Sequence, residues 1–583
     1  MAGLAGDVLL LAFVAARSTT PGLTRTFDTA QNAFSPNDLH LWLGHALLLF
    51  PATCLLGYSL APRLGPWFVA RWAALRTLRA PGRMLGLALL FILFVVGARA
   101  GHRAVLEDLP LTDDEYAVEF GGRILATGHV TAPLPLPEAA IPLLGLYVDA
   151  GRIVRADWPG GQAVAAVAEM TDLGAWAWAV LAAVPVVALG ALLARRLGTP
   201  WGLVAGLTFA GSPMALMLSF TSHAHLASRA MLALTIAAYW LSTQRGSLAA
   251  WALTGLAFGA GFLCRPFEIV FFSLPLLAWA VAQGLRRQPG YARAIPGLVL
   301  GALLPIALML AHAYAVTGHP LMPPRMTATH DVAAVTLWTR FGSNLAYNVL
   351  MLAVWFLGPL GLILVTAGVM TDTFTRLLGL GVVTALLLAL FHTNVGIHTV
   401  GPIHYSECAV PLTVIAVHGL ANLLRGARAH GLDARPLACA FGLALVVGLG
   451  IFNVAHAFTL RDQARVQRDI YGWIERGVRE SGAGRAVVLA PQFAEIWFRV
   501  PWMREVGTWV FEWRRPRLDL TEGLLIVHDG PGVEEWFRER MPDRRIYRIR
   551  LLWVMPYAVL SAVPGGAPIP LCLPGPTRGC TRP

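Results

Sequence analysis

The stretch MLGLALLFILFVVGA, residues 84–98, decides the fold because it carries no charged side chain. It forms the centre of an apolar range, 83–99, that predicts a membrane-crossing helix, for which about 20 mostly apolar residues are needed. A short acidic cluster, Thr112-Asp113-Asp114-Glu115-Tyr116, follows soon after. Charge beside hydrocarbon is costly and is usually tied to function. These two segments therefore predict a membrane protein with a candidate site next to a span.

The composition agrees with a membrane protein. The 583-residue chain is 56% hydrophobic and 13% charged, with a mean hydropathy of +0.61, whereas soluble domains average about 25% charged residues. The sequence contains no lysine, so arginine accounts for all 45 basic residues. These arginines cluster between apolar ranges, which points to membrane topology. The net charge of +12 is therefore not taken as a sign of nucleic-acid binding.

Apolar ranges of span length recur along the chain. We predict twelve spans, near 38–60, 83–99, 174–194, 201–219, 225–242, 248–264, 267–284, 295–316, 346–367, 376–391, 405–424 and 436–459. Residues 1–16 are apolar but short and contain Asp7. They could be a thirteenth span, an interfacial helix or an uncleaved signal-like start, and we find no convincing cleavage site.

The arginines predict the orientation, since cytoplasmic loops are rich in basic residues. Alternate loops hold Arg63, Arg71, Arg76, Arg79 and Arg83; Arg195 and Arg196; Arg245; Arg286, Arg287 and Arg293; and Arg425, Arg428 and Arg435. The opposite loops are 101–172, 220–224, 317–345, 392–404 and the tail after 460, and 101–172 holds 11 acidic residues against 4 arginines. We predict that this second set is extracytoplasmic.

Three regions follow from these patterns. Residues 1–82 form an N-terminal membrane segment with an Arg-rich loop, 83–459 a transmembrane domain with external loop 101–172, and 460–583 a small extracytoplasmic α/β domain. In the last region, strand-like runs at Ala486–Ala490 and Leu524–His528 and a helix-like run at 532–539 precede a Pro/Gly-rich end, predicted to be unstructured from Pro564. No nucleotide-binding motif occurs there, so we assign this domain no chemistry of its own.

The cysteines do not indicate a metal site. Four of them, Cys54, Cys264, Cys408 and Cys439, lie in or beside apolar ranges and are interpreted as packing residues. The other two lie near the C-terminus, where a disulfide is possible if that end is extracytoplasmic; they are Cys572 and Cys580.

The acidic cluster has two interpretations. Thr112 and Glu115 fit a helix capping box, with Asp113 and Asp114 in the first turn, where carboxylates complement the helix dipole. Gly128 is a plausible end for this helix. Alternatively, one carboxylate is a general base, which must lie within about 3 Å of the hydroxyl it deprotonates. Spacing alone does not decide which carboxylate that is.

A second polar segment, Asp157-Trp158-Pro159-Gly160-Gly161-Gln162, precedes the next span. Its Pro-Gly-Gly predicts a turn, and Trp158 fits an ordinary interfacial aromatic. Asp157 could instead be a second acidic group that faces the same cavity as Asp113 and Asp114.

These features in order resemble the GT-C class of membrane glycosyltransferases. The resemblance is to the dolichyl-phosphate-mannose protein mannosyltransferase superfamily with its bacterial aminoarabinose-transferase-like members. Asp114-Glu115 matches the pair that carries the proposed base, residues 259–266 (GAGFLCRP) resemble a G-x-x-x-L-x-R-P element, and residues 401–407 (GPIHYSE) resemble G-P-R-Y-Y-x-E. The resemblance covers about 83–425 and implies a polytopic α-helical fold of about 12–13 transmembrane helices. It also implies a polyprenyl-phosphate sugar donor and inverting transfer.

The chain departs from that pattern at Ile403 and His404, where the relatives have Arg and Tyr. If that arginine helps to bind the lipid phosphate, another cation must replace it. Arg265 is one candidate, although it could simply snorkel to the headgroups. Loop 317–345 offers three more, Arg325, His330 and Arg340.

Further polar residues complete the predicted substrate-binding set. His223 and His225 lie in an external turn and are either polar interfacial residues or imidazoles near a phosphate. Tyr405 belongs to the late motif. Glu407 falls near the start of a span, where an unpaired charge is costly, so we expect it to pair with Arg or His.

Three hypotheses follow. The first is a glycosyltransferase with Asp114, Asp113 or Glu115 as catalytic residues, a polyprenyl-phosphate sugar donor, and a lipid, glycan or protein acceptor. The second is a transporter or flippase for a lipid-linked or anionic substrate, a class that places ionisable groups near the bilayer midplane. The third, a structural subunit, leaves the acidic cluster unexplained. No cofactor is certain; a divalent metal is possible, although no ligand cluster stands out.

Overall fold

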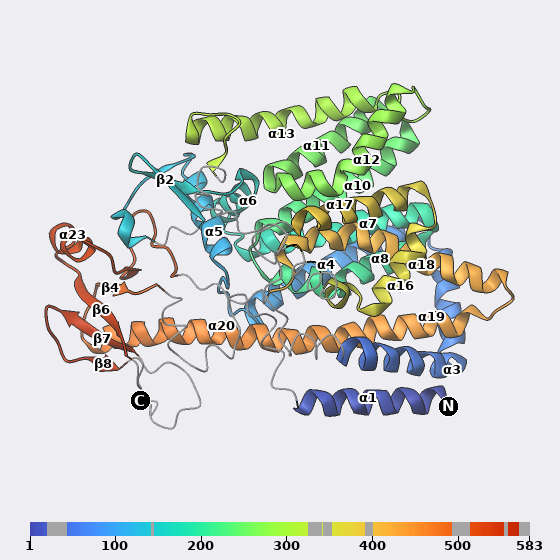
Figure 1. Cartoon of the computed structure of the whole chain (residues 1–583), viewed down its shortest axis with the longest axis horizontal. Coiled ribbons are helices and arrows are strands. Elements are labelled where there is room, and N and C mark those ends of the chain that lie inside the picture. Colours follow the sequence, from blue (N-terminus) through green and yellow to red (C-terminus); the bar gives the residue numbers. More distant parts are fainter. Residues whose placement is uncertain are drawn as a thin grey trace.

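The structure is a computed structural model of the whole chain. It describes residues 1–19, 44–141, 145–324, 341, 345, 352–390, 400–492, 513–552 and 558–570. Helices dominate, and two small sheets lie at one end of the helix bundle (Figure 1).

Helices build the membrane part, which includes the start of α20. They are α1 (Ala2–Thr19), α3 (Phe50–Arg76), α4 (Ala80–Ala104), α7 (Ala175–Leu197), α8 (Thr199–Gly211), α9 (Pro213–Leu216), α10 (Ala224–Arg245), α11 (Leu248–Cys264), α12 (Pro266–Leu285), α13 (Ala294–Thr317), α16 (Pro359–Val369), α17 (Thr373–Ala389), α18 (Ala409–Ala429), α19 (Ala434–Leu443) and α20 (Leu449–Glu480). Short helical segments join them at Gly44–Leu49 (η1), Leu218–Phe220 (η3), Ile403–Cys408 (η4) and Ala444–Gly448 (η5).

Among the described residues, seven helices are long and apolar enough to cross a membrane. An eighth is possible if α8 and the segment 213–220, bent by 67° at a short break, count as one span. α11, α16, α17 and the N-terminal helix are apolar but shorter. The predicted polytopic helical fold is confirmed, whereas this criterion does not confirm the count of twelve. Of the predicted span 346–367, the structure describes only residues 352–367.

The segment between α4 and α7 forms a compact unit. It contains α5 (Asp113–Ala126), strands β1 (Ala132–Pro133), β2 (Leu146–Asp149) and β3 (Arg152–Arg155), η2 (Glu138–Ala140) and α6 (Pro159–Met170). The strands pair antiparallel in the order β1-β3-β2. The prediction of a turn at Pro-Gly-Gly was wrong: Pro159 begins α6, and a proline in the first turn lacks only an N–H that would have no helical partner.

The C-terminal sheet has five strands in the order β5-β4-β6-β7-β8. They are β4 (Ala486–Ala490), β5 (Leu524–His528), β6 (Arg545–Leu551), β7 (Ala558–Val563) and β8 (Ile569–Pro570), and α23 (Val533–Arg540) follows β5. β4 is parallel to β5 and β6, and the remaining pairs are antiparallel. The two predicted strands and the predicted helix are confirmed. The expectation that no structure follows Pro564 was wrong, because β8 pairs with β7.

α20 connects the membrane part to this sheet without a break. Its 32 residues run from Leu449 to Glu480, so the predicted boundary at 459/460 falls inside a helix. In Figure 1, α20 is the long orange helix that leads to the sheet. The two parts are therefore joined by a continuous helix, which contains no proline or chain break.

The sheet also shares a hydrophobic core with α5 and its neighbours. Phe120 and Ile124 of α5 are buried in one cluster with Val487, Leu525 and Phe537 of the C-terminal part. Gln467 of α20 donates a hydrogen bond to the Tyr116 hydroxyl at 2.7 Å. The C-terminal part therefore covers the helix that begins with the acidic cluster.

Candidate active site

The acidic cluster begins α5 through a capping box, as the sequence predicted. The Thr112 hydroxyl accepts a hydrogen bond from the Glu115 amide, and the Glu115 carboxylate accepts one from the Thr112 amide at 3.2 Å. Gly128, with φ of +80°, follows the C-cap Thr127, which confirms the predicted end. The box fixes the first turn, and thereby the places of Asp113 and Asp114.

Glu115 also ties α5 to the turn before α10. Its carboxylate is fully buried and accepts hydrogen bonds from the amides of Leu111 at 2.9 Å and Ser222 at 2.8 Å. The Thr112 hydroxyl contacts His223 Nε2 at 3.0 Å. Burial raises the pKa of Glu115 to about 7, against these hydrogen bonds, which lower it. Its oxygens are thus engaged in holding two segments together.

The middle of α5 packs directly on α6. Gly121 and Gly122 occupy the contact: a Cβ on Gly122 would lie 2.4 Å from the Ala165 Cβ, and one on Gly121 would lie 2.6 Å from the Gln162 side chain. Glycine weakens a helix, but here its lack of a side chain permits close approach of the two helices. The contact brings the start of α6 close to α5, and the charge of Asp157 acts on Asp114.

Asp113 and Asp114 are both half-buried at the N-terminus of α5, yet their surroundings shift their pKa values in opposite directions. Burial and then the charge of Asp114 raise the pKa of Asp113 to about 7. For Asp114, burial and Asp157 favour the neutral acid, but positive charge on His223, Arg155 and Arg265 outweighs both and lowers its pKa. At neutral pH, Asp114 is therefore the carboxylate held in its charged form.

Arg155 is a cation that sequence reasoning did not select. It ends β3, is fully buried, and pairs with Asp157 through Nη2 at 2.5 Å from Oδ2. Its Nε and Nη1 have no hydrogen-bond acceptor in the described part of the chain. Buried donors without acceptors are costly, so two further hydrogen bonds can be made here. In the sequence, Arg155 is marked only by its position two residues before Asp157.

Arg265 lies between α11 and α12 and pairs with Glu268 at 2.6 Å. Only 14% of its side chain is exposed, which does not fit a guanidinium that snorkels to the headgroups. Glu268 is another residue that was not selected from the sequence. Gly160 lies against Cys264, where a Cβ would meet the sulfur at 2.6 Å, so the start of α6 abuts the end of α11.

The late motif contributes a buried carboxylate. Glu407 in η4 is fully buried and accepts from His225 Nδ1 at 3.0 Å and from the Ser228 hydroxyl. This confirms the expected pairing of Glu407 with a basic residue. His225 Nε2 is buried and has no partner within the described residues.

The other histidines gather around this pair. The His225 ring lies 6.2 Å from that of His223 and 6.0 Å from that of His404, between ring centroids. His404 is half-buried, whereas Tyr405 is 1% exposed and lies in the hydrophobic core. The structure thus brings η4, α10 and the start of α5 together, although they are far apart in sequence.

The cations proposed from loop 317–345, Arg325, His330 and Arg340, lie outside the described residues, as do Cys572 and Cys580. The C-terminal part contributes Arg515, a buried residue whose charge lowers the pKa of Asp113. The sequence had assigned that part no role near the acids.

In the described ranges, no group of three or more His, Cys, Asp or Glu is placed to hold a metal ion. The divalent metal stays a prediction.

The fold is similar to that of a protein of known structure. A crystal structure of ArnT from Cupriavidus metallidurans bound to undecaprenyl phosphate matches with a TM-score of 0.50 and 12% identity, over 81% of this chain and 97% of that chain. The apo structure of the same protein gives a TM-score of 0.49 and 13% identity, over 79% and 92%. No curated protein matches the sequence.

The family model described as dolichyl-phosphate-mannose-protein mannosyltransferase matches residues 162–314. This range runs from α6 to α13 and leaves the acidic cluster outside it. Over this range the chain is similar to these mannosyltransferases, and over most of its length it shares the fold of ArnT. The resemblance stated from the sequence motifs is thereby confirmed.

Proposed function

We propose that the protein is a membrane glycosyltransferase that moves a sugar from a polyprenyl-phosphate donor to an acceptor hydroxyl on the extracytoplasmic side. One observation carries the proposal: Asp114, at the start of α5, lies within the electrostatic reach of Arg155 and Arg265. A carboxylate beside two cations provides a base and a binding place for a phosphate. The undecaprenyl phosphate bound by ArnT, which shares the fold, supports a donor of that chemistry.

The donor phosphate would be held by Arg155 and Arg265. Arg155 has two donors without acceptors in the described part of the chain, and a planar guanidinium can bind two phosphate oxygens. Arg155 would then supply the positive charge that the resembling proteins have as an arginine at the position of Ile403.

The reaction would be a single displacement. The acceptor oxygen attacks the anomeric carbon as its proton passes to Asp114, and the bond from that carbon to the phosphate oxygen breaks. The polyprenyl phosphate leaves with the electron pair, and the two arginines stabilise its charge. Such preorganised stabilisation is usually a large part of catalysis. Because attack and departure occur on opposite faces, the anomeric configuration inverts.

Lipid and glycan profiling of a strain that lacks the gene tests this function directly. We expect one envelope glycan or glycolipid to lose a single sugar, and the polyprenyl-phosphate form of that sugar to accumulate. Complementation with the wild-type gene should restore both. Unchanged profiles in the deletion strain, with no intermediate accumulating, would contradict transfer as the function.

Replacing Arg265 by alanine should raise the donor KM and lower turnover, because a phosphate contact can strengthen in the transition state. We expect a loss of about 10- to 100-fold in kcat/KM, as for removal of one charged contact. Steady-state kinetics with purified protein measure it. Arg286→Ala, between α12 and α13, is a control with the same loss of charge. Unchanged donor kinetics in a folded Arg265→Ala protein would remove Arg265 from the site.

The extracytoplasmic placement is part of the proposal and rests on the arginines. In Figure 1, α5, α6 and both sheets lie at one end of the bundle, and the α12–α13 and α18–α19 connections at the other. An impermeant maleimide should therefore label a cysteine introduced at the exposed His129 in intact cells, but not one at Leu432. Labelling at Leu432 alone would reverse the orientation and exclude the mechanism on this side.

The transporter alternative is less well supported. Transporters place ionisable groups near the bilayer midplane, whereas Asp113, Asp114 and Asp157 lie between the candidate spans that end at Ala104 and begin at Ala175. If the protein is a transporter, the purified protein will not transfer sugar from the donor. The kinetic assay therefore distinguishes a transporter from a glycosyltransferase.

A further inference from the structure

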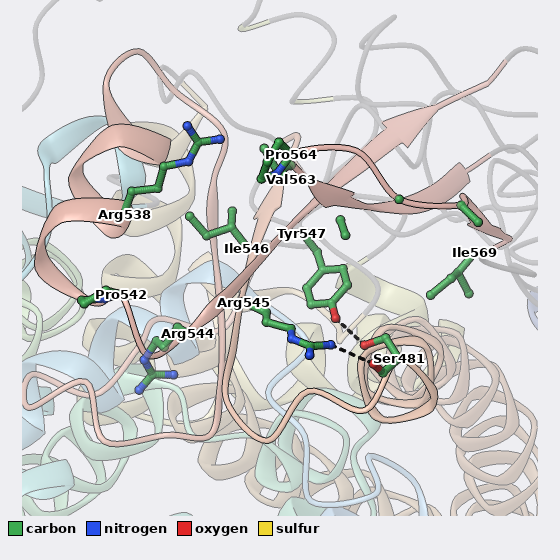
Figure 2. Close-up of a pocket in the computed structure, with 13 residues that line it drawn as sticks. Ser481, Arg538, Pro542, Arg544, Arg545, Ile546, Tyr547, Val563, Pro564 and Ile569 are labelled. Carbon is green, nitrogen blue, oxygen red and sulfur yellow. Dashed lines mark hydrogen bonds between the residues drawn. The ribbon is translucent and has the colours of Figure 1, made fainter.

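The C-terminal part contains a pocket of about 570 Å³, at the edge formed by α23, β6 and β7. This volume lies in the range of pockets for small organic ligands, about 300–1,000 Å³. Its walls include Ile546, Val563 and Ile569, with Tyr547 beside them. Figure 2 shows these side chains between α23 and the end of α20, where Ser481 lies.

Three arginines line the pocket, and none of its lining residues is acidic. They are Arg538, Arg544 and Arg545. Glu534 pairs with Arg538 and with Arg548, so the charge of Arg538 is already balanced by a carboxylate. Asp543 pairs with Arg485. The positive charge that the pocket keeps is therefore that of Arg544 and Arg545.

The arginines differ in how much of each guanidinium is used. Arg545 donates through Nη1 to the Ser481 carbonyl at 3.0 Å, which fixes its head at the pocket wall (Figure 2). Arg544 is 4% exposed and donates to the carbonyls of Leu520, Gly523 and Ala486, so it holds the strands. Its Nε has no acceptor among the described residues. Arg538, half-exposed on α23, can turn towards a ligand by leaving its pair with Glu534, which keeps Arg548 as a partner.

We propose that this pocket binds a saccharide unit that bears a phosphate group. The arginines provide charged donors for phosphate oxygens, and the partly exposed apolar wall of Val563 and Ile569 fits the less polar face of a sugar. A lone phosphate would leave most of the volume empty. The site is separate from Asp114 and does not depend on the proposed transfer reaction. The phosphate could be free or carried by a lipid.

Calorimetric titration of the full-length protein in detergent tests the proposal, with glucose 1-phosphate, inorganic phosphate and glucose as probes. We expect glucose 1-phosphate to bind at least about tenfold more tightly than either of the others, because only it has both groups. Arg545→Gln and Arg538→Gln should each weaken it about tenfold or more, the loss typical of one charged contact. Arg550→Gln, on the same strand but outside the lining, removes the same charge and should change nothing.

Repeating the titration in detergent–phosphatidylcholine micelles with and without phosphatidylglycerol separates the two sources. If phosphatidylglycerol competes with glucose 1-phosphate, the phosphate is lipid-borne; if it does not compete, the phosphate is free. Should Arg545→Gln fail to fold, the exposed Arg538 variant still decides. Absence of glucose 1-phosphate binding at millimolar concentration, or equal weakening by Arg550→Gln, would overturn the proposal.

Discussion

Replacing Asp114 by asparagine should lower turnover by about 10²–10⁴, the contribution typical of a general base. Asparagine keeps the size and polarity of the side chain, and so preserves the first turn of α5, but it does not accept a proton at neutral pH. The donor KM should stay within a few-fold, since the base contacts the acceptor. Transfer kinetics of purified protein, at matched folded amounts, measure both quantities.

The control for Asp114→Asn is Asp149→Asn, because Asp149 is an exposed carboxylate at the end of β2 in the same loop. It should retain normal rates. If both Asp114→Asn and Asp113→Asn are as active as the wild type, the acidic cluster serves helix capping alone, and the proposed enzyme mechanism loses its main support.

The pH profile distinguishes the two aspartates. Asp113 has a pKa of about 7, so it is protonated below that value and can accept a proton only above it. If Asp113 is the base, kcat/KM rises with pH to a plateau above about 7, and the rise disappears in Asp113→Asn. If Asp114 is the base, it is already ionised over this range and causes no such rise. A rise that persists in Asp113→Asn would report Glu115, whose pKa is also about 7.

Replacing Glu115 by alanine should destabilise the protein by at least about 3 kcal/mol. The change leaves the buried amides of Leu111, Thr112 and Ser222 without their acceptor, and each unpaired buried group costs about 1–3 kcal/mol. We therefore expect a lower apparent midpoint of thermal unfolding and less folded protein. The molecules that remain folded should lose less activity than Asp114→Asn, because Glu115 acts by positioning α5.

Glu119→Ala, one turn further along α5, provides the matched control. Glu119 lies 3.9 Å from Arg123 in an i,i+4 pair, and such pairs contribute about 0.3–0.5 kcal/mol. The midpoint should hardly change. Normal stability of Glu115→Ala, combined with a loss of turnover as large as that of Asp114→Asn, would instead identify Glu115 as a catalytic residue.

Local signals in the sequence predicted the elements that depend on local physics. The capping box at Thr112 and Glu115 follows from side chains three residues apart, and β4 and β5 follow from apolar β-branched runs. The Pro-Gly-Gly start of α6 was misinterpreted because local signals were used where a contact with a distant segment decides the structure. These residues favour turns in isolation, and only the close packing of Gly161 on Ala224, where a Cβ would lie at 2.6 Å, explains them inside a helix.

The composition of the site could be predicted only in part, because most of its contacts are not local. The pairing of Glu407 with a basic residue followed from the cost of a buried charge, but the sequence did not identify His225 as the partner, 182 residues away. Arg155 and Glu268 lie in segments without a distinctive motif. Their relevance appears only when β3, α11 and the start of α5 are brought together in space.

The core that α5 shares with the C-terminal sheet has a consequence for how the protein is made. Tyr116 and its partner Gln467 are 351 residues apart, so α5 leaves the ribosome long before the strands that cover it exist. The spans can insert one after another during this time, while Phe120 and Ile124 remain without their partners from β4, β5 and α23. Biogenesis thus ends with the closing of this core, and a chain that stops before Ala486 is an inserted protein in which the acidic helix is never covered.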